Sequence, residues 1–173
     1  MIQIKTLVIH PQDYSTDFLI PIYDDRYTVI TSNPGNRILK KLIKEHDRII
    51  MMGHGCEKGL FDSNFYTVID SNFVYLLREK ICIGIWCNAD VFFQKYKLKG
   101  LYTGMMISES DEAYMFNVNH TYGDIDASNT KFSQTMSNHI KNDNYDVESI
   151  KTEYGKVENH IVDFNKMRIY YDE

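Results

Sequence analysis

Short apolar runs alternate with segments of mixed polarity through the first half of the chain. Two of these runs, residues 49–53 and 81–86, contain no charged side chain. Continuous apolar runs of this kind are typical of strands that are buried on both faces of a sheet. The first run ends at His54 and the second at Cys87, both of them chemically reactive side chains. We therefore expect these two runs to form the centre of the fold and to lead into its site.

Hydrophobic periodicity and capping residues predict the other elements. Leu39 and Ile43, for example, fall on one face of a helix whose other face is basic. Asp13 or Ser15 is expected to cap a short helix. The expected strands cover residues 5–10, 27–31 and 101–107, a hairpin covers residues 60–61 and 66–69, helices cover residues 16–23, 37–44, 72–80, 91–96, 128–141 and 147–154, a loop covers residues 117–126, and residues 160–164 and 167–171 fit either a strand or a helix.

The repeated order of strand and helix predicts an α/β fold with a mostly parallel sheet flanked by helices. The whole chain, residues 1–173, is expected to form a single domain, because its length suits one core and no linker or repeat interrupts it. In open parallel sheets, ligands and chemistry lie outside the carboxyl ends of the strands. If the two central strands are neighbours, His54 and Cys87 therefore meet at that edge.

Composition and charge narrow the classes of function. The net charge is −5 and the charges are interspersed, so neither a nucleic acid nor a membrane surface is an expected partner. No apolar run has the length of a membrane span, and the first ten residues lack the pattern of a signal peptide. The three cysteines, an odd number without zinc-binding spacing, fit reduced thiols, and no metal or cofactor is expected. These features predict a cytoplasmic protein.

The two runs and the residues that end them resemble the pattern of caspase-like (clan CD type) cysteine peptidases, the group of caspases, gingipains, clostripain and separase. The shared pattern is an apolar block followed by His-Gly, here residues 49–55, and a second block followed by the nucleophilic cysteine, here residues 81–87. The resemblance covers residues 37–113 and implies a caspase-like three-layer sandwich.

Two features differ from the caspases themselves. Ile-Trp-Cys-Asn-Ala at residues 85–89 stands where caspases have Gln-Ala-Cys-x-Gly. His54 and Cys87 are 33 residues apart, whereas the caspase spacing is about 50 residues. These differences favour a trimmed relative that is closer to the bacterial branches.

Cys87 and His54 are the expected catalytic pair, with the thiol as nucleophile and the imidazole as base. Taken alone, a cysteine at the end of an apolar strand is more often a small buried side chain. Gly53 and Gly55, which flank His54, favour a site because they let another chain approach closely. A helix starting near Asp90 would favour the thiolate of Cys87. By the resemblance, the backbone N–H groups of Gly55 and Cys87 form the oxyanion hole.

Three further residues are expected to bind the substrate. Trp86 would form a hydrophobic wall of the cleft. Glu109 and Asp111 follow the strand expected at residues 101–107. Several members of the resembled group cleave after Arg or Lys, so these two carboxylates would line a pocket for a basic side chain.

The remaining cysteines and histidines are expected to have no part in catalysis. Cys56 is expected to be inert, although its place near His54 also allows a redox-sensitive pair with Cys87. No role is expected for His10, His46, His120, His139 and His160, since no pair of them has metal-ligand spacing.

The resulting expectation is a cysteine endopeptidase that hydrolyses a peptide or protein substrate through a thioester acyl-enzyme. One alternative is a catalytically inactive caspase-like domain that binds a protein partner through the same cleft or the loop at residues 117–126, because fold does not imply activity. The other is a thiol hydrolase with its nucleophile on a sharp strand-to-helix turn. That fold has Gly-x-Cys-x-Gly around the nucleophile, and residues 85–89 lack it.

Overall fold

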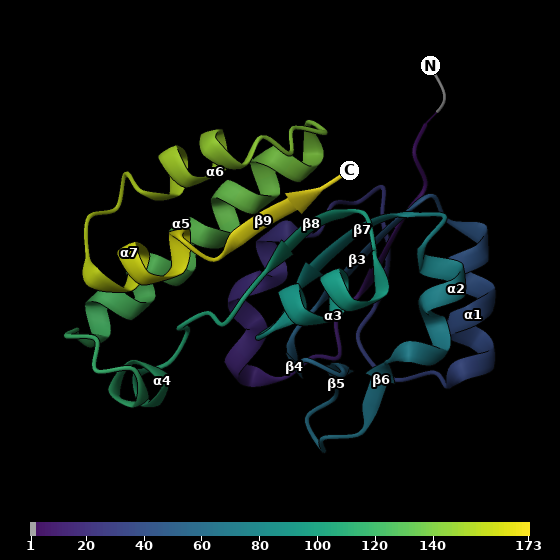
Figure 1. Ribbon diagram of the computed structural model, residues 1–173, viewed down its shortest axis with the longest axis horizontal. Coiled ribbons are helices and arrows are strands. Elements are labelled where there is room, and N and C mark those ends of the chain that lie inside the picture. Colours follow the sequence, from purple (N-terminus) through teal and green to yellow (C-terminus); the bar gives the residue numbers. More distant parts are fainter. Residues whose placement is uncertain (1–2) are drawn as a thin grey trace.

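The structure, a computed structural model, describes residues 3–173 and confirms the expected α/β architecture. A six-stranded, mostly parallel sheet carries helices on both faces, and a small antiparallel sheet lies beside it (Figure 1). The strands of the large sheet determine where the expected catalytic residues lie.

The large sheet places the two apolar runs next to each other. Its strands are β1 (Thr6–Ile9), β2 (Thr28–Ile30), β3 (Arg48–Met52), β7 (Ile81–Ile85), β8 (Gly100–Thr103) and β9 (Ile169–Asp172), in the order β2-β1-β3-β7-β8-β9. All neighbours pair in parallel except β8 and β9. The register of β3 and β7 pairs Met52 with Ile85. His54 and Cys87 each follow two residues after that pair, so both lie at the same edge of the sheet.

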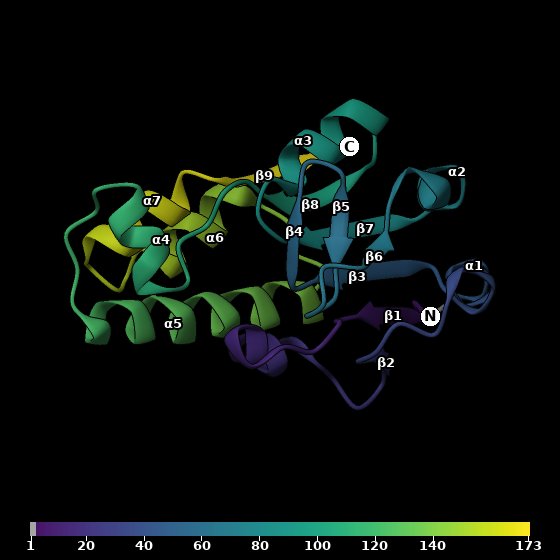
Figure 2. The ribbon, with the colours of Figure 1, turned by 90° about the horizontal axis from the view of Figure 1, so that it is seen from below.

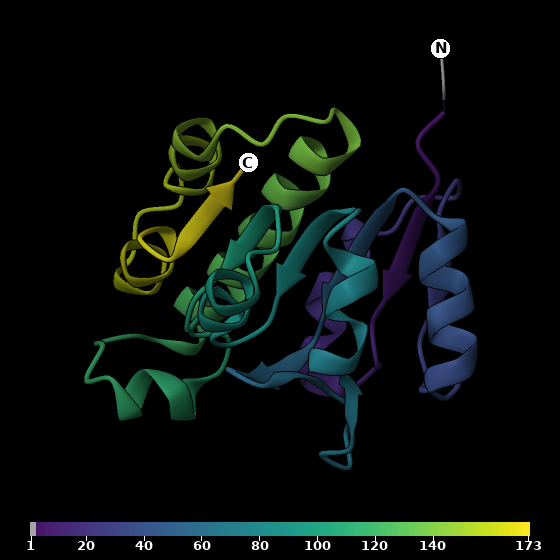
Figure 3. The same cartoon turned by 45° about the vertical axis from the view of Figure 1, so that its right-hand side comes forward.

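A small antiparallel sheet follows β3 and lies beyond the carboxyl ends of the parallel strands (Figure 3). It consists of β4 (His54–Cys56), β5 (Gly59–Phe61) and β6 (Thr67–Ile69). The expected hairpin is therefore extended by a third strand that begins at His54. Gly53 has φ +140°, which side chains rarely tolerate, and this conformation lets the chain turn from β3 into β4.

Helices bury both faces of the large sheet (Figure 2). One face carries α1 (Asn36–Glu45), η2 (Ser71–Phe73), α2 (Val74–Leu77) and α3 (Ala89–Tyr96), and the other carries η1 (Tyr14–Ile22), α5 (Tyr122–Lys141), α6 (Val147–Tyr154) and α7 (His160–Lys166). Ile49 and Met51 of β3 pack on the first side, while Ile50 and Met52 pack on the second. This double burial explains why the strand is apolar at every position after Arg48.

The chain after β8 differs from the sequence-based expectation. The strand expected at residues 101–107 ends at Thr103. A helix that was not expected, α4 (Ser110–Met115), follows after a short irregular segment. This shortening matters for the site, because residues 106–108 become a wall of the cavity rather than part of the sheet.

α5 begins at Tyr122, within the loop expected at residues 117–126. A capping box accounts for the early start. The Thr121 hydroxyl accepts the backbone N–H of Asp124, and the Asp124 carboxylate accepts the backbone N–H of Thr121. The two C-terminal segments for which strand and helix were both open form α7 and β9.

His10 joins the end of β1 to η1. Its side chain is fully buried, with Nδ1 2.6 Å from the Tyr23 hydroxyl and Nε2 2.9 Å from Thr16 Oγ1. The Thr16 hydroxyl donates to the carbonyl of Asp13, so the His10 Nε2–H donates to Thr16 and Nδ1 accepts from Tyr23. Burial lowers the pKa of His10 from 6.5 to about 4, which keeps the ring neutral.

Acid is expected to destabilise the fold through His10. Between pH 6.5 and about 4, the unfolded chain protonates this histidine while the folded chain keeps it neutral. The free energy of unfolding should therefore fall as the pH drops through this window, by an amount on the order of 3 kcal/mol. Urea denaturation of wild type and His10→Gln at several pH values measures the difference. An identical pH dependence in both proteins would contradict the prediction.

Candidate active site

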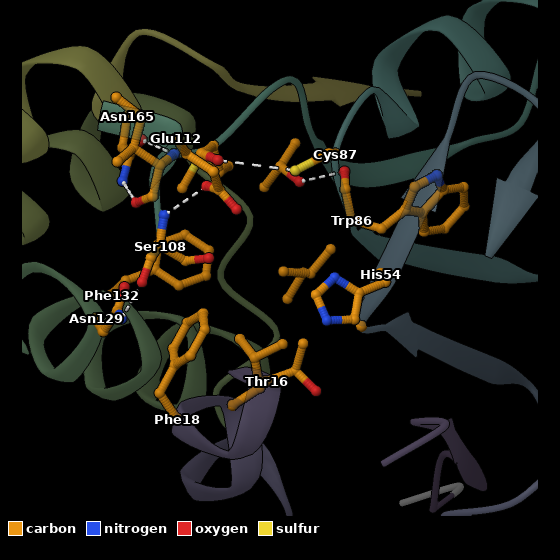
Figure 4. Close-up of a pocket in the computed structure, with 16 residues that line it drawn as sticks. Thr16, Phe18, His54, Trp86, Cys87, Ser108, Glu112, Asn129, Phe132 and Asn165 are labelled. Carbon is orange, nitrogen blue, oxygen red and sulfur yellow. Dashed lines mark hydrogen bonds between the residues drawn. The ribbon is translucent and has the colours of Figure 1, made fainter. Parts of the chain in front are cut away.

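A small cavity opens at the carboxyl ends of β3 and β7 (Figure 4). Its volume is about 50 Å³. Phe18 of η1 and Phe132 of α5 form apolar walls, while His54, Cys87 and Glu112 contribute polar groups. Segments far apart in the chain thus meet at the sheet edge where parallel α/β folds place their ligands.

His54 and Cys87 lie on the wall of the same cavity. The Cys87 thiol donates a hydrogen bond to the carbonyl of Met106 at 3.7 Å, and His54 Nε2 lies 2.6 Å from the Ser15 hydroxyl. Among the described residues, no hydrogen bond joins the thiol directly to the imidazole. Figure 4 shows both side chains at the same end of the cavity, with the Cys87 sulfur directed along its hydrogen bond to the Met106 carbonyl. The geometry brings a thiol and an imidazole to one opening.

The Cys87 thiol is protonated near neutral pH. Burial raises its pKa to about 11. The hydrogen bond to the Met106 carbonyl opposes this rise, and the nearby Glu112 carboxyl adds a smaller increase. α3 begins two residues later, at Ala89, close to the start expected near Asp90. With a pKa of about 11, the thiol needs a base to become a nucleophile.

The backbone of Gly55 in β4 lies in close contact with the Trp86 ring. A Cβ atom at Gly55 would lie 2.2 Å from the Trp86 ring, so only glycine fits there without displacing the ring. The Trp86 indole N–H donates to the carbonyl of Cys56 at 2.9 Å, and its side chain is buried, although it also lines the cavity. The backbone of β4 is thereby held against the segment that leads from β7 to Cys87.

The acidic residues after β8 differ in their relation to the cavity. Glu109 and Asp111 are exposed and do not line it, whereas Glu112 does. The sequence predicted a strand followed by a loop here, and that prediction gave no reason to place one of these three carboxylates in the cavity rather than another. The unexpected helix α4 does, because its turn directs residue 112 inward. Burial raises the pKa of Glu112 to about 7, and its Oε2 accepts the backbone N–H of Ser108 at 2.9 Å.

Two asparagines fix the wall formed by residues 106–108. Asn165 of α7 accepts the backbone N–H of Ile107 at 2.7 Å and donates to its carbonyl at 2.8 Å. Asn129 of α5 donates to the carbonyl of Ser108 at 2.9 Å. Both side chains line the cavity, and no local sequence pattern connects them to a segment so distant in the chain.

Asp13 and Ser15 are the other residues that sequence reasoning did not connect to the site. As expected, the Asp13 carboxylate caps η1 by accepting the backbone N–H of Ser15 at 2.9 Å. The Ser15 hydroxyl donates to the same carboxylate at 2.8 Å and also contacts His54. Their sequence spacing indicates a helix cap and contains no signal for a histidine 39 residues away.

The cavity has no metal-ligand cluster around it. Across residues 3–173, no group of three His, Cys, Asp or Glu side chains is arranged to hold an ion. All three cysteines are free thiols, and the sulfur of Cys56 accepts the backbone N–H of Lys58. Within the same residues, no helix combines the length and apolar character needed to cross a membrane.

Alkylation of Cys87 by iodoacetamide should become faster with pH, because only the thiolate reacts and burial raises its pKa to about 11. The rate constant should rise about tenfold per pH unit between pH 7 and 9. Glu112→Gln removes a nearby negative charge and should accelerate alkylation at pH 9. Peptide mapping by mass spectrometry separates the sites, with buried Cys82 as the unreactive internal control. A rate independent of pH would indicate a thiolate already formed at neutral pH.

Comparisons with protein-family models, with curated proteins and with solved structures found no match to this chain. The function must therefore be inferred from the site itself: a thiol, an imidazole and a carboxyl group around one small cavity.

Proposed function

We propose that the protein is a cysteine peptidase of the caspase-like type, in which Cys87 attacks a peptide carbonyl and His54 manages the protons. The observation that carries this proposal is the shared cavity at the ends of β3 and β7, where the matched register places both residues. The sequence pattern around residues 49–55 and 81–87 supports the same assignment.

The chemistry follows from the protonation states. His54 accepts the proton of the Cys87 thiol while the sulfur forms its bond to the carbonyl carbon. The N–H groups of Gly55 and Cys87, assigned through the resemblance, would hold the negatively charged oxygen. The proton then passes from His54 to the leaving amine as the C–N bond breaks. Water finally hydrolyses the thioester. Catalytic hydrogen bonds are often long in free enzymes and tighten with substrate, which suits a thiol and imidazole that do not yet touch.

The cavity favours an unbranched basic side chain next to the cut bond. Its 50 Å³ has room for about three to five groups the size of a water molecule. Phe18 and Phe132 would contact a methylene chain, and Glu112 would accept from a terminal amine. We therefore assign the role first expected of Glu109 and Asp111 to Glu112, with lysine as the preferred side chain.

The second candidate function is a domain that binds the same kind of peptide without cutting it. The protonated Cys87 thiol and its hydrogen bond to Met106 rather than to His54 favour this alternative. The hydrolase with a strained nucleophile turn has less support, because Asn88 (φ 64°), rather than Cys87, has the left-handed conformation.

Hydrolysis of fluorogenic peptides tests the proposal. Cys87→Ala should abolish turnover because it removes the nucleophile, and His54→Ala should lower kcat about 10²- to 10⁴-fold because it removes the base. Cys56→Ser is the matched control and should keep wild-type rates, since its sulfur accepts the backbone N–H of Lys58 in the adjacent turn and does not line the cavity. Peptide binding without turnover, equal in wild type and Cys87→Ala, would replace the peptidase with the binding domain.

Substrates with lysine or norleucine before the cut bond test the pocket, because the two side chains differ mainly in the amine. Glu112→Gln should lower the lysine-to-norleucine ratio of kcat/KM by about tenfold to a hundredfold, the usual effect of a charged hydrogen bond. In wild type the ratio should rise as the pH increases through about 7, where Glu112 ionises. Glu109→Gln and Asp111→Asn are matched controls, and a loss of selectivity in them but not in Glu112→Gln would contradict the assignment.

A further inference from the structure

A chain of hydrogen bonds leads away from the cavity behind His54. His54 Nε2 lies 2.6 Å from Ser15 Oγ, Ser15 Oγ lies 2.8 Å from Asp13 Oδ1, and the same Asp13 oxygen is 3.7 Å from His54 Nε2. Neither Asp13 nor Ser15 is part of the cavity wall. Their direct contact with the expected catalytic pair is made through the His54 imidazole.

The hydrogens of this chain can be assigned, because Ser15 has a single hydroxyl hydrogen. Hydrogen bonds from the backbone N–H and then from the hydroxyl of Ser15 lower the pKa of Asp13, so its carboxylate can only accept. The Ser15 hydroxyl therefore donates to Asp13, and its oxygen accepts from His54. In neutral His54 the hydrogen is consequently on Nε2, and the lone pair is on Nδ1.

The orientation of the ring completes the arrangement. Nε2 lies on the side of η1, where Ser15 is located. Figure 4 shows the other ring nitrogen turned away from η1, on the side of the imidazole where Cys87 lies. The nitrogen that carries the lone pair is thus the one nearer to the Cys87 side of the cavity.

The segment that holds His54 is itself fixed. The Asp13 carboxylate accepts the backbone N–H of Ser15 at 2.9 Å, and the Thr16 hydroxyl donates to the Asp13 carbonyl at 3.1 Å. Thr16 accepts from the buried ring of His10, and Leu19 of η1 packs in the core with α5. Rigid support of this kind is what a base needs to stay within reach of its substrate group.

We propose that Asp13 and Ser15 are positioning residues for catalysis: they hold His54 in the tautomer with hydrogen on Nε2 and direct the Nδ1 lone pair at the Cys87 thiol. The inference rests on the proposed function, in which His54 is the base. As the S–C bond forms, the thiol proton moves to Nδ1, and the Asp13 carboxylate stabilises the resulting imidazolium through Ser15. The same proton moves from Nδ1 to the leaving amine when the C–N bond breaks.

Kinetics of variants provide the first test. Ser15→Ala should lower kcat about tenfold to a hundredfold with little change in KM, because substrate contacts remain while the base loses its orientation. Ser15→Thr keeps a hydroxyl and should restore most of the rate. Asp13→Asn keeps an oxygen that can cap η1 but loses the charge, so kcat should fall here too. Asp17→Asn, which removes a carboxylate elsewhere in η1, is the matched control and should leave kcat unchanged.

The ¹⁵N NMR signals of the His54 ring provide a second test that does not require activity. Wild type should show hydrogen on Nε2 and none on Nδ1, and Ser15→Ala should show a mixture of both tautomers. A tautomer that depends on Ser15 in a protein without peptidase activity would overturn the proposed function and keep the positioning role. Normal hydrolysis with the same tautomer in wild type and Ser15→Ala would overturn the inference and keep the peptidase.

Discussion

The parallel pairing of β3 with β7 is the interaction on which the site depends. Both strands are covered on their two faces, so alternate side chains such as Ile49 and Ile50 enter different cores. A shift of one residue would exchange these faces and expose apolar side chains to the wrong packing partners. Burial therefore fixes the register, and the register in turn places His54 and Cys87 level with each other at the sheet edge.

The burial that aligns the site also opposes the charge that the proposed chemistry needs. It raises the pKa of Cys87 to about 11 and that of Glu112 to about 7. A thiol and a carboxyl group in such surroundings keep their hydrogens until a partner makes charge separation favourable. The pKa of Asp13 is shifted in the opposite direction, because hydrogen bonds from Ser15 stabilise the ionised carboxylate. The site thus combines groups held neutral inside with one fixed charge behind the histidine.

The parts of the fold that could be predicted from the sequence are those encoded by local patterns. The uninterrupted apolar runs identified β3 and β7, and the alternation of elements identified the α/β class. Where the governing contacts are distant, the sequence contained little signal: Ser15 meets His54 across 39 residues, and Asn165 meets Ile107 across 58. The position of Glu112 depended on α4, whose six residues are too few for a clear period. The capping box of Thr121 and Asp124 was a readable signal, but the Asn, His, Gly and Asp residues at 117–126 show no periodicity and therefore favoured a loop.

The double hydrogen bond between Asn165 and Ile107 has a consequence for biosynthesis. His54 and Cys87 are both synthesised well before α7, but the cavity wall at residues 106–108 is held by Asn165 of that later helix. This wall can therefore form only after α7 has been synthesised and has packed against Ile107, later than the two central strands of the sheet.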